Sequence, residues 1–263
     1  MRRQSLFFLY AYIALTLYIY ARSFLELPHQ VWTFFVLPLL ALGFVLTHSA
    51  AREGWRRTGL LLTLVIAVTL FMESLGVATG GVFGKYHYTD VLGPLFLGFV
   101  PYVVPIVWLN MIYPAYLIAD QIVPAEWDVC ARLLGVSAVT GLAMTAWDLI
   151  MDPVMVTRGH WVWEEGGAWF GIPLQNFWGW WLTSFAAIAL YLWLGGKAQR
   201  AYTKKDDRRA IILYSVMGTG TVLSGIQTGY YLAALAGFAA MGILVVRSWN
   251  SPLKRFTQKE SKP

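Results

Sequence analysis

Long apolar runs, most of them about 20 residues in length, make up most of the chain, with short polar stretches between them. A helix of about 20 apolar residues crosses the hydrocarbon core of a bilayer. The pattern predicts an all-α, polytopic membrane bundle of about eight spans: 5–21, 30–48, 59–79, 95–119, 130–150, 174–196, 210–226 and 229–246. Only the weak break at 225–229 separates the last two, so seven spans are the alternative count.

The composition supports a membrane protein. Charged residues make up 13% of the chain and hydrophobic residues 58%, whereas a soluble domain carries about 25% charged residues. We expect one transmembrane domain over 1–250 and a polar cytoplasmic tail over 251–263. The first apolar run follows Arg2 and Arg3 as in a signal peptide, but no clear cleavage site comes after it. We therefore expect a retained first span.

The basic residues lie mostly on one side of the predicted membrane. With eight spans, all 20 Lys and Arg residues except Arg22, Lys85 and Arg158 fall on the side that holds both termini. The positive-inside rule then predicts that both termini are cytoplasmic. The net charge of +6 thus reflects topology and contact with anionic lipid, and nucleic acid is not predicted as a partner.

Four polar residues are predicted to meet near the opposite face of the membrane. Glu73 lies in the outer half of the third span, Asp148 near the outer end of the fifth, and Asn176 at the start of the sixth. All three lie beside the two long non-cytoplasmic loops, 80–94 and 152–173, the second of which begins with Asp152. Intramembrane carboxylates are costly and usually mark function, although a structural hydrogen bond between helices is the alternative.

Asp148 and Asp152 are four residues apart, so a continuous helix would place both on one face. Pro153 disfavours the α conformation at Asp152, and we expect the helix to end or kink there. Two close carboxyl groups in an apolar site share a proton, which suits a general acid. The alternative role for Asp152 is to cap or turn the chain at the surface.

Aromatic residues surround these acids. Segment 147–181 holds seven of the 13 tryptophans, which either form an interfacial belt or stabilise a cation with their π faces. A second polar and aromatic cluster, 84–90, contains His87, a candidate proton relay. The candidate substrate-binding residues are Tyr86, Tyr88, Trp147, Trp161, Trp163, Trp178 and Trp181.

The sequence lacks the residues that several kinds of chemistry require. A single cysteine excludes a disulfide framework and a CxxC site, and four scattered histidines do not make the clustered boxes of di-iron hydroxylases. No lysine lies in a predicted span to form a retinal Schiff base. The 148–152 pair offers at most half of the two aspartate-rich motifs of membrane prenyltransferases. We predict neither a metal nor a cofactor.

Taken together, segments 84–90, 92–94, 100–101, 147–148, 152–153, 161–163, 171–173 and 176–180 resemble the CruF-type carotenoid 1′,2′-hydratases. The resemblance covers roughly residues 60–240. It implies hydration of the terminal double bond of an acyclic ψ end group, in lycopene, γ-carotene or a C50 analogue such as bisanhydrobacterioruberin. It further implies the bacterial cytoplasmic membrane as the location. Carotenoid and membrane lipid would be the partners, and association with other carotenoid-pathway enzymes would be compatible with this function. The basic charge balance disfavours a haloarchaeal C50 pigment.

Our hypothesis from the sequence is that Asp148 protonates the alkene and Asp152 tunes it. Glu73, Asn176 or His87 would position the water, and Trp147, Trp178 and Trp181 would line the cation pocket. A lycopene-type cyclase would use the same acid but quench the cation by ring closure. A non-enzymatic carotenoid- or lipid-binding protein would explain the aromatic residues but not the buried acids.

Overall fold

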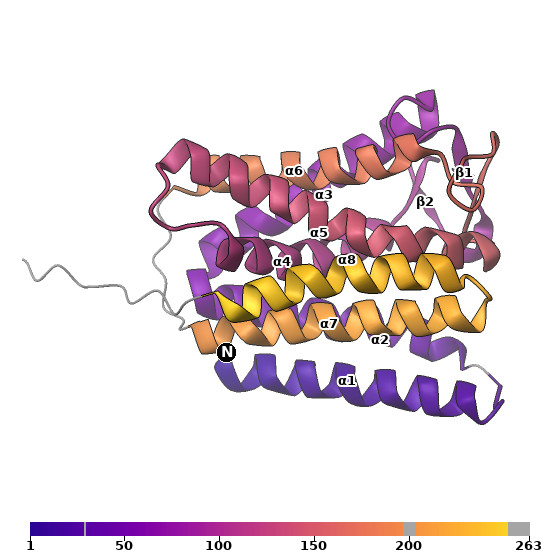
Figure 1. Cartoon of the computed structure of the whole chain (residues 1–263), viewed down its shortest axis with the longest axis horizontal. Coiled ribbons are helices and arrows are strands. Elements are labelled where there is room, and N and C mark those ends of the chain that lie inside the picture. The colour runs from indigo at the N-terminus through magenta and orange to yellow at the C-terminus, as the bar shows by residue number, and fades with distance from the viewer. Residues whose placement is uncertain (29, 197–203, 252–263) are drawn as a thin grey trace, which may run out of the picture.

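The computed structural model describes residues 1–28, 30–196 and 204–251. They form a bundle of long helices that run along one axis of the molecule (Figure 1). Apart from α4, these helices are long and apolar enough to cross a membrane, so the predicted polytopic all-α membrane fold is confirmed. The helices are α1 (Arg2–Phe24), α2 (Val31–Glu53), α3 (Trp55–Thr79), α4 (Val104–Ile122), α5 (Val129–Thr157), α6 (Leu174–Gly195), α7 (Lys204–Gln227) and α8 (Tyr231–Asn250).

Helix α4 lies inside the bundle rather than against lipid. Every residue from Trp108 to Gln121 is buried, and the helix packs against α2, α3, α5, α7 and α8. The predicted span 95–119 began too early, because residues 95–101 form a short hairpin of β2 (Leu95–Phe96) and β3 (Val100–Pro101). Proline disfavours helix in the residue before it, so the helix begins only after Pro101, with Pro105 in its first turn.

Helix α5 continues through Pro153, so the expectation that it ends at Asp152 was wrong. Proline has no N–H, so it leaves the carbonyl four residues earlier without its helical partner. That carbonyl belongs to Leu149, and the indole Nε1 of Trp169 donates to it at 2.8 Å. A tryptophan from the following loop therefore satisfies the group that proline frees, and the helix runs on to Thr157.

The two long loops meet at one end of the bundle. In Figure 1 the N-terminus and the end of α8 lie at the left, and β1 and β2 lie at the right. Strand β1 (Tyr86–Tyr88) pairs antiparallel with β4 (Trp161–Trp163), and the short 3-10 helix η1 (Asp90–Leu92) follows β1. The loops that topology predicted to be neighbours are thus hydrogen-bonded to each other. Apart from Ser251, the predicted tail lies outside the described residues.

At the opposite end, buried arginines and carboxylates form what we call the arginine network. Arg52 is 1% exposed and donates to Asp120 at 2.8 Å and to Asp207 at 2.9 Å. It also pairs with Glu53, which pairs in turn with Arg57 at 2.6 Å. The sequence analysis treated these arginines only as a topology signal; the structure shows that they also join α2, α3, α4 and α7. The other members are Arg2, Arg132, Asp206 and Arg209.

Candidate functional site

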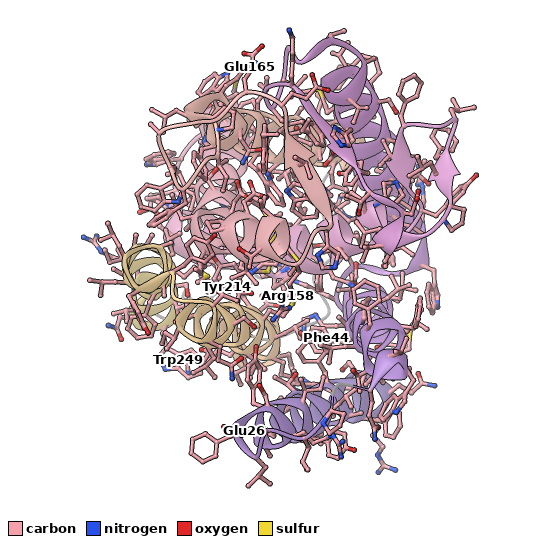
Figure 2. All side chains as sticks on the ribbon, turned by 90° about the vertical axis from the view of Figure 1, so that its right-hand side faces the viewer. Glu26, Phe44, Arg158, Glu165, Tyr214 and Trp249 are labelled. Atoms are coloured by element: carbon pink, nitrogen blue, oxygen red, sulfur yellow. The ribbon has the colours of Figure 1, made fainter. Side chains whose placement is uncertain are left out.

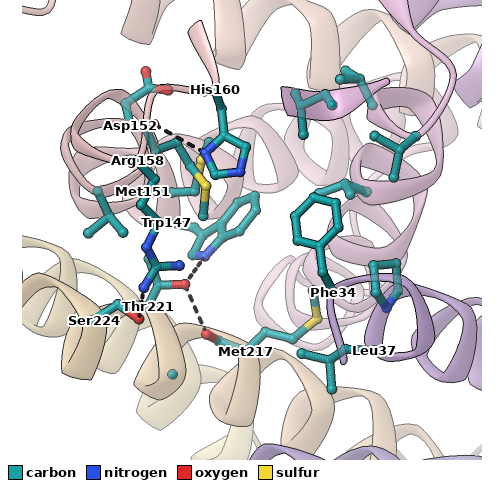
Figure 3. A pocket seen from close by; sticks show the side chains of 18 of the residues that line it. Phe34, Leu37, Trp147, Met151, Asp152, Arg158, His160, Met217, Thr221 and Ser224 are labelled. Carbon is teal, nitrogen blue, oxygen red and sulfur yellow. Dashed lines mark hydrogen bonds between the residues drawn. The ribbon is translucent and has the colours of Figure 1, made fainter. Parts of the chain in front are cut away.

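A cavity of about 650 Å³ opens at the end of the bundle that carries the paired loops. Helices α1 to α7 all contribute to its walls, α3 through Glu73, together with β1 and β4. The walls are mostly apolar, and the buried carboxyl groups of Glu73 and Asp152 face this space. Figure 3 shows part of the lining, with Asp152 and Trp147 on one side and Phe34 on the other. The volume falls in the usual range for a small-molecule site.

Asp148 and Asp152 lie side by side on α5 and share one amide. Asn176 of α6 donates from Nδ2 to Oδ2 of Asp148 at 2.8 Å and to Oδ2 of Asp152. All three residues are at most 2% exposed, and the two carboxyl groups are within hydrogen-bonding reach of each other. We call Asp148 and Asp152 the carboxyl pair and Asn176 its bridge. Two carboxyl groups with one amide donor between them suit a shared proton.

The two aspartates differ in their access to the cavity. Asp152 and Asn176 line it, whereas Asp148 is 0% exposed and lies behind them. The Oδ1 atom of Asp148 has no hydrogen-bond partner among the described residues. Asp152 is also within hydrogen-bonding reach of Trp161 on β4. A substrate in the cavity therefore meets Asp152 first.

Glu73 of α3 is a second buried carboxyl centre with three donors. Its Oε2 accepts from the hydroxyls of Tyr86 and, at 2.8 Å, of Tyr88, and its Oε1 accepts from the indole of Trp108 at 2.9 Å. Burial raises the pKa of Tyr86 and of Tyr88 well above the ordinary tyrosine value, so both hydroxyls keep the protons that they donate. The three donors offset part of the cost of burying this carboxyl group.

Three tryptophans form a wall between the two carboxyl centres, and we call them the tryptophan cage. The rings of Trp108 and Trp180 stack with centroids 4.0 Å apart, and Trp147 meets Trp180 edge-on at 5.9 Å. All three line the cavity. Sequence reasoning included only Trp147. The signal for Trp180 was its spacing, because it follows Asn176 by four residues and so lies on the same face of α6.

The structure does not bring Trp178 and Trp181 to the cavity, which corrects their assignment as substrate-binding residues. Trp178 is 59% exposed and stacks on Trp181 with ring centroids 4.8 Å apart. Trp181 packs over Gly141 of α5, where a Cβ atom would come within 2.7 Å of its ring. Both lie on faces of α6 other than the one that carries Asn176 and Trp180.

His87 also lies away from the site. Successive residues of a strand point to opposite sides, so Tyr86 and Tyr88 face the cavity while the exposed His87 approaches Glu164 at 3.8 Å on the other side. Trp161 and Trp163, opposite Tyr88 and Tyr86 in the register, line the cavity, and their role in substrate binding stays a prediction. His87 is therefore not placed to position a water molecule at the carboxyl groups.

His160 is a lining residue that the sequence analysis did not select. It is 6% exposed and stacks on Phe34 of α2 with centroids 6.0 Å apart. Burial lowers its pKa below the ordinary histidine value, so the ring is neutral at pH 7. Within residues 1–28, 30–196 and 204–251, no group of three or more His, Cys, Asp or Glu side chains is placed to hold a metal ion.

The two neighbouring tryptophans of α6 provide a matched test of this geometry. If the reaction that the sequence resemblance implies takes place in this cavity, Trp180→Leu, which removes a ring that stacks in the cage, is expected to lower turnover by about 10-fold, in line with a lost cation–π contact of about 1–2 kcal/mol. Trp178→Leu changes an exposed ring outside the cavity and should leave turnover unchanged. Conversion of an acyclic carotenoid, the substrate class that the resemblance implies, measures both in isolated membranes. Equal losses in the two variants would contradict the placement of the cage.

Within the part of the chain that the structure describes, seven helices are long and apolar enough to cross a membrane, and a largely apolar cavity with buried carboxyl groups lies inside the bundle. These features define an integral membrane protein. A family model described as carotenoid biosynthesis protein matches residues 30–244. The chain therefore belongs to the carotenoid biosynthesis protein family, and the resemblance found in the sequence is confirmed at that level.

One curated relative carries a more specific name. The chain is 33% identical over 137 residues to the bisanhydrobacterioruberin hydratase of Haloarcula japonica, in an alignment that covers 52% of this chain and 45% of that protein. The chain thus matches about half the length of this curated relative. No solved structure matches the chain.

Proposed function

We propose that the protein is a carotenoid hydratase that adds water across the terminal C1′–C2′ double bond of an acyclic ψ end group. The observation that carries the proposal is the buried carboxyl pair, which opens through Asp152 onto an apolar cavity beside the tryptophan cage. Alkene hydration needs a proton donor, a stabilised carbocation and water, and it involves no net redox change. The hydratase name of the Haloarcula relative supports the same chemistry.

In this proposal Asp152 delivers the proton. The alkene carbon must approach the acid within hydrogen-bonding reach, and Asp152 is the member of the pair that lines the cavity. Asp148, behind it, shares the proton and holds Asn176 in place through the 2.8 Å hydrogen bond. The roles are thus the reverse of the sequence-based hypothesis. The π electrons of the alkene form a C–H bond at the less substituted carbon, and the positive charge falls on the tertiary carbon.

The tryptophan cage and Glu73 stabilise the tertiary cation. Indole rings attract a cation at their faces, and Trp108, Trp147 and Trp180 together border the cavity from α4, α5 and α6. Glu73 adds a negative charge beside this wall, because its partner Trp108 belongs to both centres. Charge stabilisation that is already in place before the reaction is usually the largest contribution to catalysis.

Water completes the reaction, and Glu73 is placed to receive its proton. A lone pair of water forms the C–O bond at the tertiary carbon, and the oxygen then loses a proton. Glu73, held by Tyr86 and Tyr88, accepts that proton. Glu73 then releases a proton to water and the carboxyl pair takes one up from water, which restores both centres. The product is a tertiary alcohol, and the overall change is the addition of one water molecule.

The function is tested by expressing the chain in a host that accumulates an acyclic carotenoid and extracting the pigments. We expect a product heavier by one water molecule whose visible absorption is almost unchanged, because the conjugated system is not altered. The same host without the chain is the control, and supplying a C40 and a C50 substrate in parallel addresses chain length. A pigment of unchanged mass with a shortened chromophore would instead indicate a cyclase. Unaltered pigment would contradict both activities.

A further inference from the structure

Helix α7 carries a row of polar side chains along the apolar cavity. Thr221, Ser224 and Gln227 follow one another at three-residue intervals, so they lie along one face of the helix. All three line the cavity, as do Tyr20 of α1 and Arg158 at the end of α5. We call these five residues the hydroxyl stripe. None of them takes part in the proton-transfer and cation-stabilising steps above.

Two separate groups of hydrogen bonds lie along the stripe, one near the mouth of the cavity and one deeper. Arg158 donates to Ser224 Oγ at 3.2 Å, Ser224 lies 3.1 Å from the hydroxyl of Tyr20, and Tyr20 donates to the carbonyl of Gly220. One turn deeper, Thr221 Oγ1 accepts from the indole of Trp147 at 2.9 Å. Figure 3 shows this order, from Arg158 through Ser224 and Thr221 to Trp147. The stripe therefore ends at the tryptophan cage.

The outer end of the stripe faces the surrounding medium. Arg158 is exposed, and in the end-on view of Figure 2 it lies between the helices coloured tan and those coloured violet. Ser224, in contrast, is only 6% exposed. The polar groups thus connect an accessible cation at the mouth to buried hydroxyls beside the cage.

Hydrogen bonds between membrane helices are often only structural, and these tie α7 to α1 and α5. Their position favours a second role, because the residues that carry these hydroxyls also line the cavity. A buried water molecule needs two to four polar partners. In an otherwise apolar cavity the stripe offers such partners in sequence, and it leads to the place where the cation forms.

We propose that the hydroxyl stripe binds water, the second substrate, and passes it to the cation. The inference rests on the proposed hydratase function. The cation can react in two ways: water captures it and gives the alcohol, or the carbon that was just protonated loses a proton and the alkene is restored. The stripe controls the competition between these two reactions. Weakening the stripe slows the first reaction and leaves protonation by Asp152 unchanged.

The use of D₂O as solvent separates the two reactions. Protonation then delivers a deuteron, and a cation that loses the original proton returns as substrate that carries deuterium. For Ser224→Ala we expect alcohol formation to fall by about 10-fold, the size of one lost hydrogen bond in the transition state. Deuterium in the recovered substrate, relative to alcohol formed, should rise by about the same factor. Mass spectrometry of extracted carotenoids measures both.

The matched control is Ser215→Ala on the same helix. Its hydroxyl donates to Ile211 O, and it borders a separate small cavity with Thr219 and Phe238, so both readouts should equal those of the wild type. If Ser224→Ala does not fold, Tyr20→Phe removes the next hydroxyl in the chain of hydrogen bonds and should shift the ratio in the same direction.

Two results would overturn the assignment of the stripe: alcohol and deuterium exchange that fall together, which indicates a merely structural role, or an unchanged ratio. A wild-type protein that yields neither alcohol nor deuterated substrate would overturn the hydratase proposal itself, and the stripe proposal with it. A failure of the stripe proposal therefore shows in the ratio measured for the variant, whereas a failure of the hydratase proposal shows in the activity of the wild type.

Discussion

Asp152→Asn is expected to lower hydration by about 10³-fold, within the range of about 10²- to 10⁴-fold that general acid catalysis contributes. Asparagine has the shape of the carboxylic acid and can still contact Asn176 and Trp161, but it has no acidic proton to give to the alkene. The fold should therefore persist while the first chemical step is lost. The measurement is the rate of alcohol formation in membranes, normalised to the amount of protein.

Two further variants serve as comparisons for Asp152→Asn. Asp148→Asn should cost about 10-fold, the loss of one hydrogen bond that supports the shared proton, because Asp148 lies behind Asp152 and does not line the cavity. Asp90→Asn changes an exposed carboxyl in η1 near the same end of the bundle and should have no effect. A larger loss for Asp148→Asn than for Asp152→Asn would restore the sequence-based assignment. Wild-type activity in both variants would remove the pair from the mechanism.

Arg52→Leu is expected to produce the largest loss of stability, about 3–5 kcal/mol. The guanidinium is 1% exposed and is shared by Glu53, Asp120 and Asp207. Removing it takes the common cation from three buried carboxylates, although Glu53 keeps Arg57 and Asp120 keeps Arg132. Breaking a buried ion-pair network is far more costly than losing a surface ion pair. The thermal midpoint of the protein in detergent, followed by the recovery of soluble monodisperse material, measures the effect.

The control for this variant lies four residues along the chain. Arg56 is exposed, so Arg56→Leu should leave the midpoint within the small range usual for surface changes. The arginine network lies at the opposite end of the bundle from the cavity, so the folded fraction of Arg52→Leu should retain its hydration rate per molecule. An unchanged midpoint in Arg52→Leu would show that the network does not stabilise the fold.

Topology alone brought the carboxyl groups together. Apolar runs of membrane-spanning length set the number of helices, and their alternating direction placed Glu73, Asp148 and Asn176 at one end before any contact was known. The spacing of four residues put Asp148 and Asp152 on one face. These inferences depend only on local periodicity and on counting, and the structure shows the expected contacts between Asn176 and both aspartates.

Local rules failed where a distant residue intervened. Pro153 disfavours a helix at Asp152, but the indole of Trp169, 20 residues from Leu149 in sequence, satisfies the freed carbonyl. The arginines at the end of the bundle that holds the N-terminus agree with the positive-inside rule. Their pairing with Asp206 and Asp207 depends on how α1 and α2 are placed relative to α7. No pattern within one segment contains that information.

For this protein, the sequence by itself determined the membrane fold, the family resemblance and which acidic residues meet, because hydrophobic length, helical period and chain direction are properties of single segments. Only the tertiary structure decided which aspartate faces the cavity, which tryptophans form the cage and which polar residues of α7 line the way in. The physical reason is placement: the rotation of α6 against its neighbours separates Trp180 from Trp178, and position along α5 relative to the cavity separates Asp152 from Asp148. Both are set by packing between segments far apart in the chain.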